Sequence, residues 1–233
     1  MPKKSAKAIK PKKHAAVSLL KNEGKTAGRF IVLDGPDGAG KSTQARILSE
    51  HLEQRGKKVL LLREPGGTAA GEAIRKILLE QREGGDHLSP LAETFLFQAA
   101  RAQLIEEVVK PALAAGTWVI CDRFSLSTLV YQGLAGGVDT GVIEKLSAIA
   151  TTGVRPDRYL VVWVPTNVGV ERRADRAADR MESKGDAFLR AVADSFRKTA
   201  KREPKKYRLI DGQGSLDDVR ERIWNAVEPL LKK

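Results

Sequence analysis

Short apolar runs alternate with longer amphipathic segments along most of the chain. Runs rich in Val, Ile and Leu are typical of strands buried in a parallel sheet, whereas apolar residues at helical spacing predict helices. The predicted strands are residues 29–35, 59–62, 118–124, 159–164 and 207–211. Strands and helices that alternate in this way predict an α/β fold with five parallel strands, right-handed crossovers and helices on both faces.

Capping residues and glycines set the expected ends of the helices. The first helix is predicted from Ser42 to Gly56, and a second covers 69–82 before a glycine pair. A third begins at the N-cap Ser89 and continues to about residue 110, where Pro111 is expected to kink or restart it. A last helix opens at Ser215 with a capping-box pattern. The strand at 59–62 is apolar at every position, which predicts burial on both of its faces.

The N-terminal segment 1–28 differs from the rest of the chain. It holds eight lysines and the single acid Glu23, and so contributes +7 to the net charge of +12. Apart from a short apolar cluster around Leu19, it lacks the apolar surface needed to offset the entropy of ordering. We expect 1–28 to be a disordered basic extension and 29–233 to form one domain. A lysine-rich arm can contact nucleic acid or anionic surfaces, but a solvated extension is the simpler interpretation.

Residues 35–43, Gly-Pro-Asp-Gly-Ala-Gly-Lys-Ser-Thr, match the phosphate-binding pattern G-x-x-x-x-G-K-[ST]. The match lies between a predicted strand and a predicted helix, so backbone N–H groups and the helix dipole would act on one anion. Lys41 is expected to reach the β- and γ-phosphates of a nucleotide, and the Ser42 hydroxyl to bind Mg²⁺. The dinucleotide pattern G-x-G-x-x-G does not fit this glycine spacing.

Charged residues end two of the predicted strands. The second strand is followed by Arg-Glu-Pro-Gly-Gly-Thr at 63–68, and the third ends in Asp122 and Arg123. Because parallel strands end at one edge of a sheet, Arg63 is well placed for a second phosphate, and Asp122 for water ligands of Mg²⁺. The glycine-rich stretch after Arg63 fits a simple turn equally well, and Asp122 fits a helix cap as an alternative.

Two further groups of side chains fit either a structural or a binding role. Phe97 and Arg101 share one helical face, where they could stack on and hydrogen-bond a base, although such residues more often form core and surface ion pairs. The second group is a run of arginines at roughly helical spacing between 167 and 184. Its members are Arg172, Arg173, Arg176 and Arg180. Taken alone, such a run is usually a solvated face.

Cysteine and hydropathy patterns indicate the compartment. Cys121 is the only cysteine and cannot form an internal disulfide, which suits a reducing cytosol. The chain contains no run of 18 apolar residues and no apolar signal segment. We therefore expect a cytoplasmic protein that does not cross a membrane.

From residue 29 to about 232 the chain resembles the thymidylate kinases, a family of P-loop nucleoside monophosphate kinases. Four motifs in the family's order carry the resemblance, and the second and fourth are specific to this family among nucleotide kinases. They are DGPDGAGKST at 34–43, REPGGT at 63–68, FQAAR at 97–101, and DRF at 122–124 through YQG at 131–133. The resemblance implies a three-layer P-loop NTPase fold with a short LID at about 167–185. It also implies transfer of the γ-phosphoryl group of ATP to the 5′-phosphate of dTMP, giving ADP and dTDP.

The resemblance also implies a role for each matching residue. ATP is expected to bind Gly35, Pro36, Asp37, Gly38, Ala39, Gly40, Lys41, Ser42, Thr43, Arg172 and Arg180. dTMP is expected to bind Asp37, Arg63, Pro65, Phe97, Arg101, Arg123, Ser127, Thr128, Tyr131 and Gln132. Within this set, Asp37 accepts a hydrogen bond from the 3′-hydroxyl, Tyr131 crowds the 2′ position, Phe97 stacks on thymine and Arg101 donates to a ring carbonyl. The expected catalytic residues are Lys41, Asp122, Arg123 and Arg176, with Ser42 and Asp122 holding Mg²⁺ partly through water.

One position departs from part of the family. Members with a basic residue inside the phosphate loop use it on the transferring phosphate, and here that position is Gly38. The positive charge is therefore expected from the LID, from Arg176 first and from Arg172 or Arg180 next.

Several expectations concern ligands and partners. We expect ATP, dTMP and Mg²⁺ to bind, and a homodimer to form because the family is usually dimeric. A kinase for another nucleoside monophosphate is the main alternative, because the phosphate loop alone does not choose the acceptor. A nucleic-acid-binding regulatory ATPase, suggested by the basic extension, is the weaker one. The sequence does not decide whether Pro65 is cis.

Overall fold

The computed structural model describes residues 28–80, 88–174 and 179–232. Three expectations therefore concern positions outside the described residues. These are the disorder of the basic extension, the glycine pair that closes the second helix, and the position of Arg176.

Five parallel strands form one sheet, as the hydrophobic pattern predicts. They are β1 (Phe30–Asp34), β2 (Val59–Arg63), β3 (Trp118–Asp122), β4 (Arg158–Trp163) and β5 (Arg208–Asp211). The strands lie in the order β2-β3-β1-β4-β5, and each neighbouring pair is parallel. Leu33 of β1 pairs with Asp122 of β3, so the central strands end side by side at one edge of the sheet.

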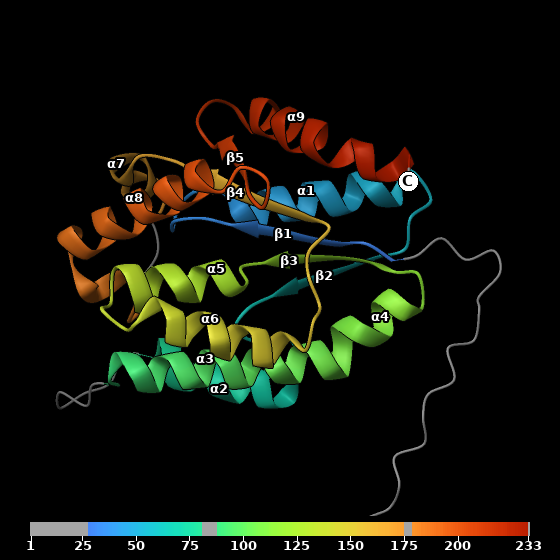
Figure 1. The fold of residues 1–233 in the computed structure, drawn as a ribbon. Coiled ribbons are helices and arrows are strands. Elements are labelled where there is room, and N and C mark those ends of the chain that lie inside the picture. The colour runs from blue at the N-terminus through green and yellow to red at the C-terminus, as the bar shows by residue number, and fades with distance from the viewer. Residues whose placement is uncertain (1–27, 81–87, 175–178, 233) are drawn as a thin grey trace, which may run out of the picture.

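Helices cover both faces of this sheet, which makes three layers (Figure 1). Side chains alternate along β1, so Ile31 and Leu33 pack toward α1 and α9, whereas Phe30 and Val32 pack toward the helices of the opposite layer. The first layer contains α1 (Lys41–Glu53) and α9 (Leu216–Val227). The second contains α3 (Pro90–Leu104), α5 (Ser125–Thr128), η3 (Leu129–Leu134), α6 (Thr140–Thr151) and α8 (Asp186–Arg202). These layers confirm the predicted α/β fold.

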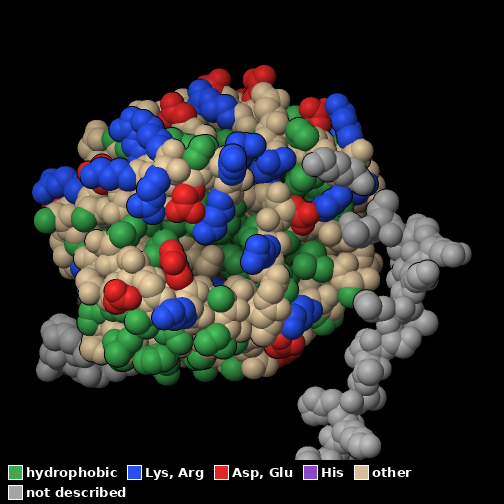
Figure 2. All heavy atoms as spheres, in the orientation of Figure 1, with side chains coloured by type: hydrophobic (Ala, Val, Ile, Leu, Met, Phe, Trp, Pro, Cys, Tyr) green, Lys and Arg blue, Asp and Glu red, His purple; other side chains and the backbone are tan. Residues whose placement is uncertain are grey.

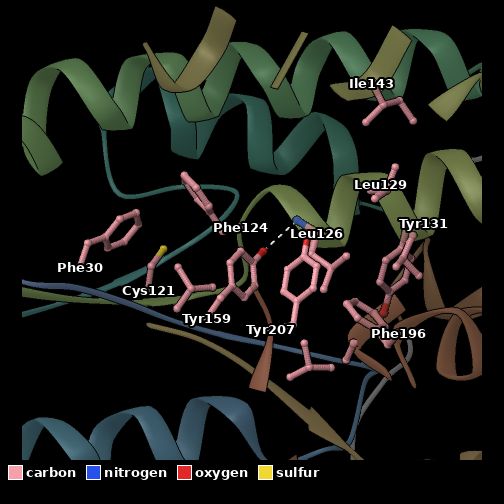
Figure 3. Packing of buried hydrophobic residues seen from close by; sticks show 14 of the residues in the cluster. Phe30, Cys121, Phe124, Leu126, Leu129, Tyr131, Ile143, Tyr159, Phe196 and Tyr207 are labelled. Atoms are coloured by element: carbon pink, nitrogen blue, oxygen red, sulfur yellow. Dashed lines mark hydrogen bonds between the residues drawn. The ribbon is translucent and has the colours of Figure 1, made fainter. Parts of the chain in front are cut away.

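Aromatic side chains fill the core between the sheet and the second layer (Figure 3). Phe30 meets Phe124 edge to face, with ring centroids 5.1 Å apart. Tyr159 and Tyr207 meet in the same way at 5.0 Å. The Tyr159 hydroxyl accepts a hydrogen bond of 2.8 Å from the backbone N–H of Leu126, shown as a dashed line in Figure 3. This contact ties the start of α5 to the centre of the sheet.

Shorter elements complete the fold. They are α2 (Ala69–Leu79), which packs on α3, followed by α4 (Lys110–Ala114), α7 (Thr166–Glu171), η4 (Glu182–Lys184) and η5 (Glu228–Lys232). The two predicted serine caps are confirmed: Ser89 accepts a hydrogen bond from the N–H of Ala92, and Ser215 forms a capping box with Asp218. The first helix ends earlier than predicted, because α1 stops at Glu53 with Gln54 as its C-cap and does not reach Gly56.

The burial predicted for β2 is wrong. The segment is a strand, but Leu61 is 42% exposed and no residue of β2 is fully buried. The cause is the position of β2 at the edge of the sheet, because an edge strand has a neighbour on one side only. An apolar run identifies a strand, but it does not reveal the order of the strands.

The third predicted helix continues across Pro111 without a sharp break. A π-helical segment, η2 (Ile105–Val109), directly precedes α4, in which Pro111 is the second residue. A proline lacks an N–H and its ring collides with the carbonyl four residues earlier, and a wider turn removes both conflicts. The expected disturbance at Pro111 is therefore a local widening.

Two of the longer helices, α6 and α8, were not predicted. In α8 the buried residues Leu189, Val192, Phe196 and Ala200 recur three or four positions apart, so a helical signal was present. In α6 the buried residues are fewer, and Ile149 is largely exposed.

The surface divides by chemistry (Figure 2). Lysine and arginine side chains spread over the upper part of this view, where α8 and α9 lie, and hydrophobic side chains gather along the lower edge near α2 and α3. Within the described ranges, no helix has the length and apolar character needed to cross a membrane.

Candidate active site

The loop between β1 and α1 makes a tight turn that ends at the first residue of α1. Gly40 is the N-cap of α1, with φ of +86°, a left-handed conformation that glycine adopts at low cost. At Gly38, a Cβ would lie 2.2 Å from the carbonyl oxygen of Gly169 in α7, so any side chain there would collide with α7. The loop therefore cannot carry a basic residue at this position without moving α7.

Lys41 lies at the start of α1 and is buried. Its Nζ donates a hydrogen bond of 2.7 Å to the carbonyl oxygen of Pro36 in the loop. Burial and the nearby Arg123 charge lower the pKa of Lys41 to about 8, although Asp37 and Asp122 act in the opposite direction. The ammonium group therefore lies in a site that would gain from a polyanion.

The adjacent hydroxyl of Ser42 faces the end of β3. It donates a hydrogen bond to Oδ2 of Asp122, while the buried Oδ1 of Asp122 has no hydrogen-bond partner among the described residues. A hydroxyl, a carboxylate and an unsatisfied carboxylate oxygen fit a small divalent cation that keeps several waters and binds phosphate oxygens. Ser42 and Asp122 are therefore the residues that could hold Mg²⁺.

Arg123 occupies a strained backbone position at the end of β3, with φ of +73°. One guanidinium nitrogen donates to the carbonyl of Gly35 and to the Ser127 hydroxyl, each at 3.0 Å, and the other donates to Asp37. The Tyr131 hydroxyl also donates to Asp37, at 2.6 Å. Burial alone would raise the pKa of Asp37, but the charge of Arg123 and the other contacts hold it well below its usual value. An ionised carboxylate, a fixed cation and a phenol thus converge at this point.

A buried carboxylate holds this turn in place. Asp34, the last residue of β1, is fully buried and accepts hydrogen bonds from the hydroxyls of Tyr159 and Ser127 at 2.8 and 2.6 Å. It also accepts from the backbone N–H groups of Gly35, Phe124 and Ser127. The residues around Arg123 are therefore fixed on the end of β1. Asp34 is the first residue of the motif at 34–43, but nothing in that pattern indicated that Asp34 holds the turn at Arg123.

A second buried network lies under the end of β2. The guanidinium of Arg101 pairs with Glu64 at 2.7 Å and donates to Gln98 and Thr128 at 2.8 and 3.1 Å. Arg101 is only 1% exposed, and the peptide bond between Glu64 and Pro65 is cis. Burial raises the pKa of Glu64, against the charge of Arg101. In this structure Arg101 is buried and holds Glu64 and Thr128, two residues that line the site.

The phosphate loop and these strand ends enclose a cleft of about 770 Å³, within the range that binds small ligands. The predicted site residues that line it are Asp37, Gly38, Ala39, Gly40, Lys41, Ser42, Thr43, Arg63, Pro65, Phe97, Asp122, Arg123, Ser127, Thr128, Tyr131, Gln132 and Arg172. Of the predicted residues that the structure describes, four are not among the lining residues, namely Gly35, Pro36, Arg101 and Arg180. The structure thus brings most of the predicted residues to one cleft from separate segments.

The arginine run divides into two groups. Arg172 lines the cleft and donates to the carbonyl of Gly212 at 3.0 Å, and Arg173 lies beside it. Arg180 points elsewhere, with hydrogen bonds to the carbonyl of Leu78 and to Glu93 at 2.8 and 2.6 Å. The arginines do not share one helical face, because α7 ends at Glu171, before the first of them.

Arg75 of α2 is a cleft residue that was not predicted. It donates a hydrogen bond of 2.9 Å to the carbonyl of Pro65. Burial and the nearby Arg63 charge lower the pKa of Arg75. It was missed because a lone arginine on an amphipathic helix resembles any surface cation.

Fold and site together define a class of protein. The first strand leads through a glycine-rich loop into a helix whose N-terminus, lysine and serine face the cleft. An acid at the end of the neighbouring strand accompanies them. These features define a P-loop nucleotide-binding protein. The Arg123 guanidinium opposite the loop could bind a second anionic ligand.

Comparisons with known proteins identify the family. The model of the thymidylate kinase family matches residues 33–223. The chain is 44% identical over 207 residues to the thymidylate kinase of Rhizorhabdus wittichii, covering 88% of this chain and 99% of the relative. It is 45% identical over 202 residues to a Synechococcus thymidylate kinase, covering 87% and 95%. The crystal structure of the Ehrlichia chaffeensis thymidylate kinase matches at a TM-score of 0.69 and 30% identity, covering 87% of this chain and 99% of that one. The chain belongs to the thymidylate kinase family.

Proposed function

We propose that the chain transfers the γ-phosphoryl group of ATP to the 5′-phosphate of dTMP, giving ADP and dTDP. One observation carries this proposal: a single cleft joins a phosphate loop to a pocket that contains Arg123, Asp37, Tyr131 and Phe97. The first part suits the triphosphate of the donor, and the second suits a phosphate, a sugar and a base. The family supplies the identity of both nucleotides.

The donor is held by charge and by backbone N–H groups. Lys41 and the amides of 35–43 bind the phosphates of ATP, and the Lys41 side chain exchanges the Pro36 carbonyl for a phosphate oxygen. Ser42 and Asp122 would hold Mg²⁺, partly through water, and the bound ion would supply positive charge beside the phosphates. Little bond-making chemistry is required of these groups beyond holding the reacting oxygens in line.

The acceptor is positioned by groups that reach different parts of dTMP. Arg63 and Arg123 bind its phosphate and reduce the repulsion between the two nucleotides. Asp37, ionised and fixed by Arg123, accepts a hydrogen bond from the 3′-hydroxyl. Tyr131, held on Asp37, crowds the 2′ position and favours deoxyribose.

The base binds between α3 and the segment that follows β3. Phe97 stacks on thymine, and Ser127, Thr128 and Gln132 lie at its edge together with Pro65. Arg101 stays the proposed donor to a ring carbonyl, and its bond to Thr128 connects it to the cleft wall.

Positive charge on the transferring group comes from the segment after α7. The collision that a side chain at Gly38 would make with Gly169 supports a source outside the loop. Arg176 remains the first candidate and Arg172, already at the cleft, the second. Arg180 is the third, although it contacts Glu93 in this structure.

We also propose a homodimer in the cytoplasm. Exposed hydrophobic residues lie on the neighbouring helices α2, α3 and α6, and hydrophobic side chains gather at the lower edge of Figure 2, near α2 and α3. The exposed residues are Ile77, Leu91, Phe95, Val142 and Ile149. Exposed apolar residues on neighbouring helices favour contact with a second copy of the chain. Any contact with nucleic acid is expected only from the basic extension.

The test is ADP formation by the full chain with dTMP, dUMP, dCMP, AMP or GMP as the acceptor. We expect a clear preference for dTMP. Some activity with dUMP is expected, because a pocket for one methyl group discriminates by only about 1–3 kcal/mol. A preference for any other acceptor would contradict the proposed specificity, and ADP formation independent of every acceptor would contradict the transfer itself.

A further inference from the structure

Glu93 is a buried carboxylate that the proposed mechanism does not use. It lies on α3, is 1% exposed, and accepts hydrogen bonds from three side chains. Arg180 and Lys184 donate to it at 2.6 and 3.1 Å, and the side-chain amide of Gln132 donates at 3.1 Å. Two of these partners are cations away from the cleft, whereas Gln132 lines the cleft itself. Glu93 therefore connects two cations, Arg180 and Lys184, to Gln132, which lies where the base is proposed to bind.

The two cations determine the protonation state of Glu93. Burial by itself would raise the pKa of this carboxyl, but the hydrogen bonds from Arg180, Gln132 and Lys184 and the charge of Lys184 outweigh burial and lower it. An ionised carboxylate has only acceptor sites. The group of Gln132 that faces Glu93 must therefore be its NH₂.

The contact with Glu93 also fixes the direction of the Gln132 side-chain oxygen, Oε1. Oε1 of Gln132 has no hydrogen-bond partner within the described part of the chain, and Gln132 lines the cleft near Phe97 and Thr128. With the NH₂ group held on Glu93, the carbonyl oxygen is the atom left for a ligand. A carbonyl oxygen accepts a hydrogen bond from a ring N–H and repels a ring nitrogen that carries a lone pair.

We propose that Glu93 is a positioning residue that selects the base by fixing the side-chain amide of Gln132 with its oxygen toward the cleft. The site then favours a pyrimidine with an N–H at ring position 3, as in thymine and uracil. It rejects cytosine, whose position 3 is an acceptor. This inference rests on the proposed function, because it assumes a pyrimidine monophosphate at this wall.

The test replaces Glu93 by glutamine and measures kcat/KM for dTMP and dCMP. In Glu93→Gln the new amide can present either a carbonyl or an NH₂ group, so Gln132 is no longer held in one orientation. We expect the dTMP to dCMP ratio of kcat/KM to fall about tenfold or more. The matched control is Glu106→Gln, at an exposed ion pair with Lys110, which should leave the ratio unchanged.

A second measurement separates positioning from general support. In a Gln132→Leu background, Glu93→Gln should not change the ratio further, because the amide through which Glu93 acts is gone. If Glu93→Gln lowers kcat/KM for both nucleotides equally, Glu93 only supports the fold, and the inference is wrong. An unchanged ratio overturns it as well.

Folding and the underlying function have their own controls. If Glu93→Gln does not fold, the double variant Glu93→Gln/Arg180→Gln is used, because it removes one charge of each sign from the cluster around Glu93. The same fall in the dTMP to dCMP ratio of kcat/KM is expected for it. A wild-type chain without a preference for dTMP over dCMP would contradict the proposed function. A wild-type preference that Glu93→Gln retains would contradict only the inference.

Discussion

The two sides of the cleft are built in different ways. Most of the donor side comes from one continuous segment, 35–43, whose backbone, lysine and serine act directly, and Asp122 joins it from the end of β3. The acceptor side is assembled from side chains on β2, α2, α3, α5 and η3. Buried carboxylates hold three of its residues: Asp34 contacts Ser127, Glu64 contacts Arg101, and Glu93 contacts Gln132. Substitutions on the donor side should therefore slow the reaction with every acceptor. Those on the acceptor side should change which nucleotide is used, or how tightly.

The largest effect is expected from Arg176, a residue outside 35–43 that we propose to act on the transferring phosphoryl group. Arg176→Ala should lower kcat about 10³-fold or more while changing KM for dTMP little, because an arginine on the transferring phosphoryl group can be worth that much. Steady-state kinetics with dTMP measure both constants, and Arg190→Ala, at an exposed position on α8, is the control. An unchanged kcat would show that Arg176 does not act on the transferring phosphoryl group.

Lys41→Met should lower kcat by about 10²–10³-fold, the usual effect of removing one donor to a developing charge. The reduction should be equal with dTMP and dUMP, because Lys41 acts on the donor. Kinetics with both acceptors test this, with Lys57→Met as the control, since Lys57 lies over the Trp118 ring. If kcat fell with only one of the two acceptors, Lys41 would also act on the acceptor, and the two sides of the cleft would not be separate.

Asp34→Asn should destabilise the fold by about 2–4 kcal/mol. The new NH₂ group faces donors that now lack an acceptor, and each buried unsatisfied group costs about 1–3 kcal/mol. Urea unfolding measures the loss, and Asp217→Asn, at an exposed pair with Arg220, is the control. We also expect a higher KM for dTMP, because Asp34 fixes the turn that carries Arg123. Wild-type stability and KM together would show that Asp34 does not hold this turn.

Phe97→Leu should raise KM for dTMP by roughly 5- to 100-fold, since base stacking on an aromatic ring contributes about 1–3 kcal/mol. KM for ATP should stay constant, because Phe97 lies on the acceptor side. Phe95→Leu is a matched control on the same helix, where Phe95 is 53% exposed. Equal changes in the two KM values would indicate that α3 has shifted as a whole.

The same contrast explains what the sequence could predict. Residues 35–43 carry their function in a continuous pattern, so the loop, its flanking elements and the parallel sheet were all predictable. The partners of Asp34 and Glu93 lie far away in the chain, and no local pattern connects Glu93 to Gln132 or to Arg180. Strand order was likewise not encoded locally, which is why burial of β2 was mispredicted. Motifs of the acceptor side were recognised through the family resemblance, and their supporting groups were not.

The smallest effect concerns pH and tests how deeply the donor side is buried. In the free enzyme, burial and the Arg123 charge lower the pKa of Lys41 to about 8, whereas phosphates bound beside it favour the ammonium form. Binding of ATP above pH 8 should therefore take up a proton, and Kd should rise by at most about tenfold per pH unit. Calorimetry at pH 9 in two buffers of different ionisation enthalpy measures this uptake, which Lys41→Met should remove. If wild type and Lys41→Met take up equal amounts, Lys41 is already charged in the free enzyme, and the donor side is more open to water than the structure indicates.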